Sequence, residues 1–296
     1  MRQSVQLRAL LAEQKKILSI GVFDCFSAKL AEHAGFQLVS ISGNTLTASL
    51  VGLPDLGLIT MTEVAHQAHN IADSVGIPVL ADGDTGYGNA LNAMRAVREF
   101  EAAGVAGMSI EDQVFPKRSS SIAKARVIPV AEMVAKIKAA CEARRSEDFI
   151  VIGRTDAMSG EGIDGAIERA VRYGEAGADV IFVNSLKTED EMRKLTRAIA
   201  KPVKINVSEG TPASIFTSDQ LFEFGFSIVS YSGFMQRAAG KAMLSALEIF
   251  RREGTTEGAM KDILMSKADR YAVLGLAKYG DLEARLFGAA DAGGKA

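Results

Sequence analysis

The hydrophobic positions of the chain fall into short apolar runs, and each run is followed by a segment with helical periodicity. Eight runs have strand length, at 17–22, 37–43, 78–82, 105–112, 149–156, 179–185, 203–207 and 226–232. In the segments between them, apolar residues recur about every 3.6 positions. Several of these segments end in a glycine that favours the left-handed helix terminus, namely Gly35, Gly104, Gly177 and Gly225.

Strands that are apolar on both faces and alternate with helices predict a parallel sheet covered by helices. Eight such units in 296 residues favour a closed (β/α)8 barrel, with a doubly wound open sheet as the alternative. We expect a single domain over 1–296, with the barrel at about 15–254 and a short N-terminal helix over 5–14. Residues 255–287 form no further βα unit and predict a helical tail that packs on a neighbouring subunit.

Composition narrows the class of partner and the compartment. Hydrophobic residues make up 48% and charged residues 24%, as in a soluble globular protein with a large core. A net charge of -2 gives no electrostatic reason for a nucleic-acid or anionic-membrane partner. We see no basic and apolar leader and no apolar run of about 18 residues, so we expect a cytoplasmic protein. Two cysteines, Cys25 and Cys141, fit a reducing compartment.

Polar residues gather where the predicted strands end, and the carboxyl ends of barrel strands carry the active site. The three histidines, His33, His66 and His69, fall in helical segments, so the chemistry depends on other groups. The carboxylates near strand ends are Asp55, Asp82, Asp84, Glu111, Asp112 and Asp156. Carboxylates at close range repel, so they require a cation or a shared proton. Oxygen ligands without histidine or cysteine favour Mg²⁺, or Mn²⁺, over zinc.

Structural roles stay open for some of these residues. A lone aspartate at a strand end is commonly a helix cap or a loop hydrogen bond, which applies to Asp112 and Asp156. Arg154 ends the fifth run. It either pairs with Glu111 or Asp84 or clamps a substrate carboxylate with its forked nitrogens. Other runs end in neutral polar residues, which are Ser42, Gly43, Asn44, Asn184 and Asn206.

The segment 114–127 joins the fourth run to its helix and is long for such a loop. It mixes cations with a run of serines. As a lid over a charged substrate it would exclude water and bring Lys117 or Arg118 to the site. A solvated loop without this role is the alternative.

These motifs together resemble the isocitrate lyase / phosphoenolpyruvate mutase superfamily, in particular its short bacterial members. The resemblance covers roughly residues 15–287. The matching segments are Ser42-Gly43, Gly52-Leu-Pro-Asp55, Asp82-Gly-Asp-Thr-Gly-Tyr-Gly-Asn89, Ile110-Glu-Asp-Gln113 with Pro116-Lys117, and Arg154-Thr-Asp-Ala157. The segments Asn206-Val-Ser-Glu-Gly210 and Leu282-Glu-Ala-Arg285 agree more loosely.

The resemblance implies an Mg²⁺-dependent barrel with a gating loop, and a homotetramer whose last barrel helix is swapped between paired subunits. It implies cleavage of a C–C or P–C bond beside an α-oxycarboxylate through a metal-bound enolate. Asp82 matches the direct metal ligand, and Asp55, Asp84 and Glu111 match the carboxylates that hold its waters. The groups expected at the substrate are Ser42, Gly43, Asn44, Arg154, Asn184 and Asn206, with Lys117, Ser119 and Arg154 as the catalytic candidates.

Two departures narrow the reaction. The lyases carry a lid cysteine that protonates the carbanion, whereas this chain has Lys117-Arg-Ser119-Ser-Ser121, and serine is a poor general acid. The lyases also tend to carry a glutamate after the sixth strand, where this chain has Phe182-Val-Asn184. Both changes argue against the isocitrate and methylisocitrate lyase reactions.

We therefore expect an Mg²⁺-dependent lyase that cleaves the C–C bond of a small 2-oxo or 2-hydroxy dicarboxylate, such as an oxaloacetate- or 2-alkylmalate-like diacid. One alternative is P–C chemistry on a phosphonopyruvate-like substrate, because Phe115-Pro-Lys-Arg-Ser-Ser120 is similar to the lid of the mutase branch. A catalytically silent barrel that binds metabolites is the other.

Overall fold

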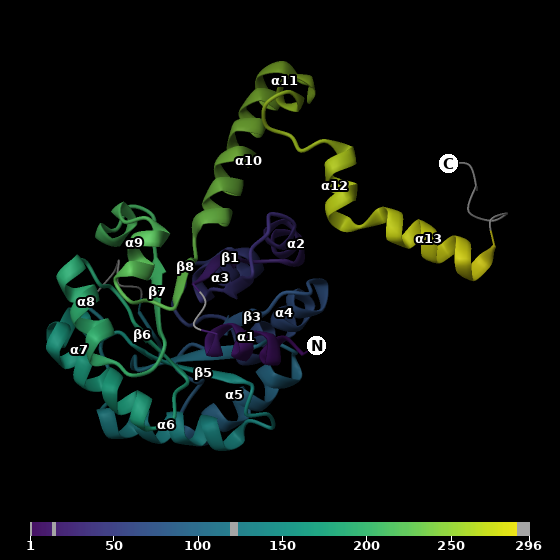
Figure 1. Cartoon of the computed structure of the whole chain (residues 1–296). Helices are drawn as coiled ribbons and strands as arrows, with labels where there is room; N and C mark the ends of the chain where they lie inside the picture. The colour runs from purple at the N-terminus through teal and green to yellow at the C-terminus, as the bar shows by residue number, and fades with distance from the viewer. Residues whose placement is uncertain (1, 14–15, 119–123, 289–296) are drawn as a thin grey trace. The chain divides into compact units, whose positions relative to one another are not determined.

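The computed structural model describes residues 2–13, 16–118 and 124–288. It contains a closed barrel of eight parallel strands in sequential order, β1 to β8, as predicted. Figure 1 shows the strands surrounded by helices. The strands are β1 (Ile17–Val22), β2 (Leu38–Ile41), β3 (Val79–Asp82), β4 (Gly107–Glu111), β5 (Ile150–Thr155), β6 (Val180–Val183), β7 (Val203–Val207) and β8 (Ile228–Tyr231). Pairing of Ile17 with Ile228 closes the barrel.

The helices that follow the strands end where the glycines predict. The four predicted glycines all have positive φ, from 87° at Gly35 to 112° at Gly177. The helices of this unit are α1 (Gln3–Ala12), α2 (Cys25–His33), α3 (Gly43–Val51), α4 (Met61–Ser74), α5 (Ala90–Ala102), α6 (Val130–Ala143), α7 (Met158–Glu175), α8 (Glu189–Ala198) and α9 (Ser218–Glu223), with a 3₁₀ turn at Pro212–Ile215.

Two elements differ from the sequence prediction. Helix α3 occupies much of the segment expected to be a loop, and it begins immediately after β2. Its sequence, Gly43-Asn-Thr-Leu-Thr, is rich in poor helix formers, so local propensity gives little sign of a helix. Helix α7 begins five residues earlier than Ile163, and Gly162, with φ of 70°, interrupts its helical geometry.

The hydrophobic residues form two layers around the strands. The larger layer lies between the strands and the outer helices. The smaller layer fills the barrel interior, and Leu7 of α1 packs into it beside Ile17 and Leu38. Helix α1 therefore covers the amino-terminal end of the barrel, where an ion pair of 2.8 Å joins Arg8 to Asp179. The opposite end, formed by the carboxyl ends of the strands, is the end at which barrel enzymes carry their active sites.

Chain contacts divide the protein into two compact units, residues 1–236 and 237–296. Helix α10 (Phe234–Glu253) spans the division, and the second unit also contains α11 (Glu257–Met260), α12 (Lys267–Leu274) and α13 (Leu276–Phe287). Three helices after α10 agree with the predicted helical tail. The single domain and the exchange of a barrel helix between subunits stay predictions. None of the helices in the described ranges combines the length and the apolar composition that a membrane span requires.

The seam between β1 and β8 offers a test of the barrel. A Cβ added at Gly21 would lie 2.6 Å from the Cα of Ser232. We expect Gly21→Ala to lower the free energy of unfolding by about 1–3 kcal/mol or more, because backbone atoms must shift. Gly160, on the exposed start of α7, has open space around its Cα and provides the control. Gly160→Ala should be neutral or slightly stabilising in the same urea titration. Equal losses from both substitutions would contradict the packing at this seam.

Candidate active site

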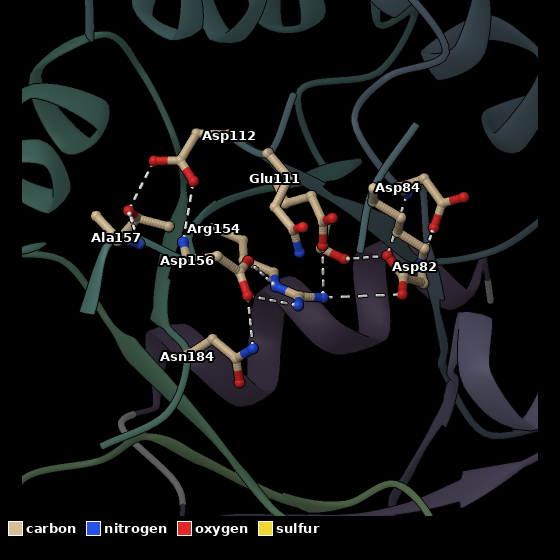
Figure 2. A network of polar contacts seen from close by, with 12 residues as sticks. Asp82, Asp84, Glu111, Asp112, Arg154, Asp156, Ala157 and Asn184 are labelled. Atoms are coloured by element: carbon tan, nitrogen blue, oxygen red, sulfur yellow. Dashed lines mark hydrogen bonds and ion pairs between the residues drawn. The ribbon is translucent and has the colours of Figure 1, made fainter. Parts of the chain in front are cut away.

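The structure brings the predicted polar residues together at the carboxyl-end mouth of the barrel. A cavity of about 460 Å³ opens there, and its wall includes Asp55, Asp82, Lys117 and Arg154. Asp82 ends β3, Glu111 ends β4 and Arg154 lies near the end of β5, so three neighbouring strands supply the charged side chains. Figure 2 shows Arg154 between these carboxylates.

Asp82 is held by hydrogen bonds from three directions. Its Oδ2 accepts from the backbone N–H of Gly43 at 3.2 Å, and its Oδ1 accepts from the N–H of Asp84 at 3.1 Å and from Ser109 Oγ at 3.3 Å. Burial by itself raises the pKa of Asp82, but Lys117, Arg154 and the two backbone donors outweigh it, so the pKa lies below its usual value. The Asp82 carboxylate is therefore ionised and fixed in orientation.

Gly43 lies where a side chain would crowd the charged groups. A Cβ at this position would lie 2.9 Å from Lys117 Nζ, 3.1 Å from Asp82 Oδ2 and 3.3 Å from Asp55 Oδ2. A glycine at the start of α3 thus leaves space beside the carboxylates and lets its N–H point at them. This is the close backbone approach that glycine alone allows without displacing these groups.

Lys117 reaches into the cluster of carboxylates. Its ammonium lies 2.9 Å from Asp55 Oδ2 and donates a short hydrogen bond to Asp84 Oδ1. Burial lowers the pKa of Lys117, but the surrounding carboxylates outweigh burial and raise it well above its usual value. Burial removes the Asp84 carboxylate from water and raises its pKa to about 6. Lys117 opposes this rise, and repulsion from the Asp82 carboxylate adds to it. Lys117 is thus the internal counter-ion of Asp55 and Asp84.

The Asp84 backbone has φ of 47°, in the left-handed region that non-glycine residues rarely adopt. Its carbonyl accepts from the Glu111 N–H at 2.8 Å and its N–H donates to Asp82, so contacts on both sides hold this conformation. Such conformations persist where the surrounding structure determines them, commonly at functional sites.

Arg154 contacts carboxylates from three strand ends. Its Nη1 lies 2.8 Å from Glu111 Oε2 and 3.9 Å from Asp82 Oδ2, and its Nε and Nη2 donate to the two oxygens of Asp156 at 2.8 and 3.0 Å. Of the two roles left open by the sequence, the ion pair with Glu111 is present. The forked grip on a carboxylate is also present, but Asp156 is the carboxylate that occupies it. A clamp on substrate stays a prediction.

Asp112 belongs to a buried structural network, which is one of the alternatives that the sequence left open. It accepts from Thr155 Oγ1 and Tyr173 Oη at 2.7 Å and from the N–H of Asp156 at 2.9 Å, and its Oδ2 lies 3.4 Å from Arg169 Nη1. Asp112 thereby fixes the chain at Asp156, and Asp156 fixes Arg154. Asn184 adds to this fixation, since its Nδ2 donates to Asp156 Oδ1 at 2.6 Å.

The remaining predicted residues lie at the same mouth, with one exception. Ser42, Asn44 and Asn206 line the cavity, and Asn206 Nδ2 donates to Ser232 Oγ at 3.1 Å. Ser119 lies outside the described residues. The base of the predicted lid is closed by an antiparallel bridge between Gln113 and Val127.

The donor set at the mouth fits a hydrated divalent cation. Glu111 is 1% exposed, and neither of its oxygens accepts a hydrogen bond from a described residue, although Arg154 Nη1 forms an ion pair with Oε2. Among the described residues, no three His, Cys, Asp or Glu side chains are arranged to hold an ion directly. Mg²⁺ keeps several waters and takes only one or two carboxylates directly. The buried Glu111 carboxylate, which has an ion pair with Arg154 but accepts no hydrogen bond from a described residue, and the other hard oxygen donors are compatible with that mode.

A larger hollow of about 810 Å³ lies at the opposite end of the barrel, beside α1 and the loops that precede β3, β4 and β5. Its wall carries Arg2, Asp73, Glu101 and Arg145. Catalytic groups of barrel enzymes lie at the carboxyl ends of the strands. The candidate site is therefore the mouth cavity, although it is smaller than this hollow.

One charged residue of the interior was missed by the sequence analysis. Lys204 lies on β7 and is buried. The signal was present, because a lysine and Asn206 occupy alternate positions in the apolar run Val203-Lys-Ile-Asn-Val207 and so face the same side of the strand.

Removal of the Lys117 ammonium tests the charge balance of the mouth. We expect Lys117→Met to lower the free energy of unfolding at pH 7 by about 3 kcal/mol, because it leaves buried carboxylates uncompensated. The pKa of Asp84, which is already raised to about 6 by burial, then rises further because Lys117 no longer opposes the shift. Protonation of Asp84 therefore relieves part of the loss as the pH falls toward 5. Added Mg²⁺ should raise the Tm of this variant more than that of the parent protein.

Exposed Lys124, on the other side of the predicted lid, provides the matched control. Lys124→Met should change neither the Tm nor its response to Mg²⁺ or pH. If both variants lose the same stability at both pH values, the contact of Lys117 with the carboxylates is wrong.

Comparison with known proteins places this site in a family. The sequence profile described as phosphoenolpyruvate phosphomutase matches residues 7–251. A 2,3-dimethylmalate lyase of Eubacterium barkeri is 38% identical over 283 residues, which cover 96% of this chain and 98% of that protein. A 2-methylisocitrate lyase of Shewanella oneidensis is 36% identical, with 96% of this chain and 97% of that protein covered.

Solved structures give the same result. The chain superimposes on a crystal structure of 2,3-dimethylmalate lyase, a member of the PEP mutase/isocitrate lyase superfamily, with a TM-score of 0.91, 31% identity and coverage of 100% and 99% of the two chains. An oxaloacetate acetylhydrolase in complex with 3,3-difluorooxalacetate gives a TM-score of 0.90 at 29% identity, with 98% of each chain covered. A phosphonopyruvate hydrolase with bound oxalate and Mg²⁺ gives 0.86 at 32% identity, covering 97% of this chain and 99% of that one.

The profile match over most of the chain, the full-length relatives and the barrel geometry agree with the resemblance seen in the sequence motifs. The chain belongs to the phosphoenolpyruvate phosphomutase family, within the PEP mutase/isocitrate lyase superfamily.

Proposed function

We propose that the protein is an Mg²⁺-dependent lyase that cleaves a C–C bond of a small 2-oxo or 2-hydroxy dicarboxylate. The observation that carries the proposal is the position of Arg154, whose guanidinium lies beside Asp82 and Glu111 at the floor of the mouth cavity. An anion-binding group next to carboxylates suited to a cation forms a site for a small oxyacid. The relatives named for dimethylmalate, methylisocitrate and oxaloacetate support a diacid.

The metal assignment follows the hydrogen bonds at the mouth. Asp82, ionised and held by three donors, is the proposed direct ligand, and Asp84, Glu111 and Asp55 would hold the waters of the ion. When bound, Mg²⁺ polarises the oxygen of the α-oxycarboxylate. The phosphonopyruvate hydrolase with oxalate and Mg²⁺ supports this choice of cation, and Mn²⁺ has the same preference for oxygen.

The protein's own groups would bind and orient the substrate. Arg154 is already fixed by Asp156, so it needs little reorganisation to receive a carboxylate. We assign the backbone of Ser42 and Gly43 to the same end of the oxyacid, because the Gly43 N–H points into the cluster. Asn44, Asn184 and Asn206 line the cavity as further contacts.

For a 2-alkylmalate-like substrate the bond changes are simple. The C2 hydroxyl loses its proton and becomes a carbonyl, the C2–C3 bond breaks, and its electron pair moves to C3 as an enolate of the second carboxylate. A proton delivered to C3 completes the reaction. Lys117, which lies among the carboxylates at the mouth, and Ser119 of the lid are the catalytic candidates for moving protons.

The lid sequence limits the reaction. Without a cysteine in Lys117-Arg-Ser119-Ser-Ser121, protonation of C3 depends on another donor or on solvent. Decarboxylation of an oxaloacetate-like diacid depends least on a proton donor in the lid, because solvent can protonate its enolate after release of CO₂. We therefore favour oxaloacetate- and 2-alkylmalate-like diacids over isocitrate and methylisocitrate.

P–C bond chemistry on a phosphonopyruvate-like substrate is the second candidate. The lid phrase Phe115-Pro-Lys-Arg-Ser-Ser120 supports it, as does a phosphoenolpyruvate phosphomutase structure from Streptomyces platensis with 34% identity and a TM-score of 0.90, covering 96% of this chain and 99% of that one.

We further propose a cytoplasmic homotetramer built from pairs that exchange the last barrel helix. Many large apolar side chains of the second unit are exposed in the single chain, including Met243, Leu247 and Phe250, which supports burial by another subunit. The net charge of -2 supports the absence of a nucleic-acid or membrane partner.

Removal of the proposed metal ligand should abolish metal-dependent turnover. We expect Asp82→Ala to lower kcat/KM by about 10²–10³-fold or more, because polarisation of the substrate oxygen is lost, while circular dichroism and Tm show an intact barrel. Exposed Asp73, on α4 at the far end of the barrel, provides the control, and Asp73→Ala should retain full activity. Unchanged activity of Asp82→Ala would contradict the metal assignment.

A substrate panel separates the candidate reactions. With Mg²⁺ present, we expect release of a pyruvate-like product from oxaloacetate or a 2-alkylmalate, measured with lactate dehydrogenase, and none after chelation with EDTA. Pyruvate kinase and ADP added to the assay also report phosphoenolpyruvate formed from phosphonopyruvate. Asp82→Ala serves as the blank, because oxaloacetate decarboxylates without enzyme. Turnover of phosphonopyruvate alone would select the P–C reaction, and no turnover of any diacid would contradict the proposed lyase.

A further inference from the structure

Lys204 of β7 points into the barrel, where it has no counter-ion. It is 8% exposed, and its Nζ lies 4.4 Å from the centre of the Phe182 ring. Among the described residues, this ring is the group that contacts the ammonium, and no carboxylate or hydrogen-bond acceptor pairs with it. A buried ammonium without a partner is costly, so its place in the interior calls for an explanation.

The ammonium borders a small polar chamber below the mouth. The chamber has a volume of about 50 Å³, and its wall includes Ser40, Ser109 and Ser230. Interiors of such barrels are commonly filled by branched aliphatic side chains, so a layer of serines around a lysine is unusual. The space is large enough for a few waters or for one small polar group of a ligand.

Two further polar atoms beside the chamber lack partners. Ser230 Oγ and Asn206 Oδ1 are buried without a hydrogen bond among the described residues. Both residues belong to the wall of the chamber, as does Lys204. The Lys204 ammonium and the Ser230 hydroxyl, which belong to residues that line one polar space, are donors of the kind that a carboxylate accepts from, whereas Asn206 Oδ1 is itself an acceptor.

The chamber adjoins the mouth cavity. The two spaces share Ser42, Asp82, Arg154, Phe182, Asn206 and Ser232 as walls. Arg154 lies 5.2 Å from the centre of the same Phe182 ring that Lys204 contacts. Both cations thus contact one ring, and Arg154, Asp82 and Lys204 all line the chamber, so a ligand held at Arg154 and Asp82 lies next to the space that Lys204 borders.

The electrostatics of Lys204 agree with a site for an anion. Burial, with Arg154 as a second cation, lowers the pKa of Lys204 to about 8, and Asp82 opposes this shift only in part. A bound anion would offset both the burial of the ammonium and its repulsion from Arg154.

We propose that Lys204 and Ser230 form an inner subsite that binds the second carboxylate of the substrate, below the groups that hold its α-oxycarboxylate end. This inference rests on the proposed function and narrows it. The subsite would select short diacids whose two carboxylates are separated by one or two carbons, because the chamber adjoins Asp82 and Arg154 directly. Lys204 acts as a specificity-determining contact.

The test compares a diacid with a monoacid. In the full chain with Mg²⁺, isothermal titration calorimetry would measure the Kd of 3,3-difluorooxaloacetate and of pyruvate. We expect Lys204→Met to weaken the diacid by about 10- to 100-fold, as for loss of a charge-assisted hydrogen bond, and to change the Kd of pyruvate less than two-fold. Lys201→Met, which removes an exposed charge just before β7, should leave both values unchanged.

Thermal unfolding without ligand separates binding from structural support. We expect the Tm of Lys204→Met to equal or exceed that of the parent, because the variant removes an uncompensated buried charge. Ser230→Ala is the second variant, and we expect it to weaken the diacid several-fold with no loss of Tm, since Ser230 Oγ has no partner to lose.

The outcomes distinguish this inference from the proposed function. If the parent protein binds neither diacid nor pyruvate with Mg²⁺, the proposed function is wrong and the subsite with it. If the parent binds the diacid and both Lys204→Met and Ser230→Ala bind it equally well, the subsite alone is wrong. Equal loss of diacid and pyruvate, or a lower Tm of Lys204→Met with unchanged binding by Ser230→Ala, would also overturn the subsite.

Discussion

The mouth of the barrel depends on the Arg154 guanidinium, which neutralises carboxylates that arrive from three strand ends. Glu111, Asp156 and Asp82 all lie within ion-pair distance of it. Burial raises the pKa of Glu111 well above its usual value even with this cation beside it. Without Arg154 the carboxylates of this cluster would become protonated, and the negative potential that attracts a divalent cation would be lost.

The position of Arg154 depends in turn on residues further from the mouth. Asp112 fixes the backbone of Asp156, and Tyr173 and Arg169 of α7 hold Asp112 from the outer layer. Packing of a helix against the barrel thereby determines the direction of a charged group at the site. Such indirect support keeps the cost of reorganising the site low when a ligand binds.

The barrel interior separates an apolar end from a polar end. Leu7, Leu38 and Ile150 fill the end covered by α1, whereas serines and Lys204 face the chamber below the mouth. Burial of the apolar end stabilises the barrel, which can then tolerate unpaired polar groups nearer the mouth. The same polarity that weakens the interior as a core makes it suitable for an anionic ligand.

The sequence by itself determined the barrel, the glycine-ended helices and the gathering of Asp82, Asp84, Glu111 and Arg154, because alternating periodicity and strand-end position are properties of neighbouring residues. It also pointed to the family through the same motifs. It placed Lys117 at the site, but it did not determine that the Lys117 ammonium would pair with Asp55 and Asp84 or that Asp156 would occupy the fork of Arg154. Nor did it determine that the Lys204 ammonium, although on the same side of β7 as Asn206, would be buried against the Phe182 ring without a counter-ion among the described residues. Only the tertiary structure decided these, because they depend on strand register, on the closure of the barrel and on charges that lie far apart in the chain.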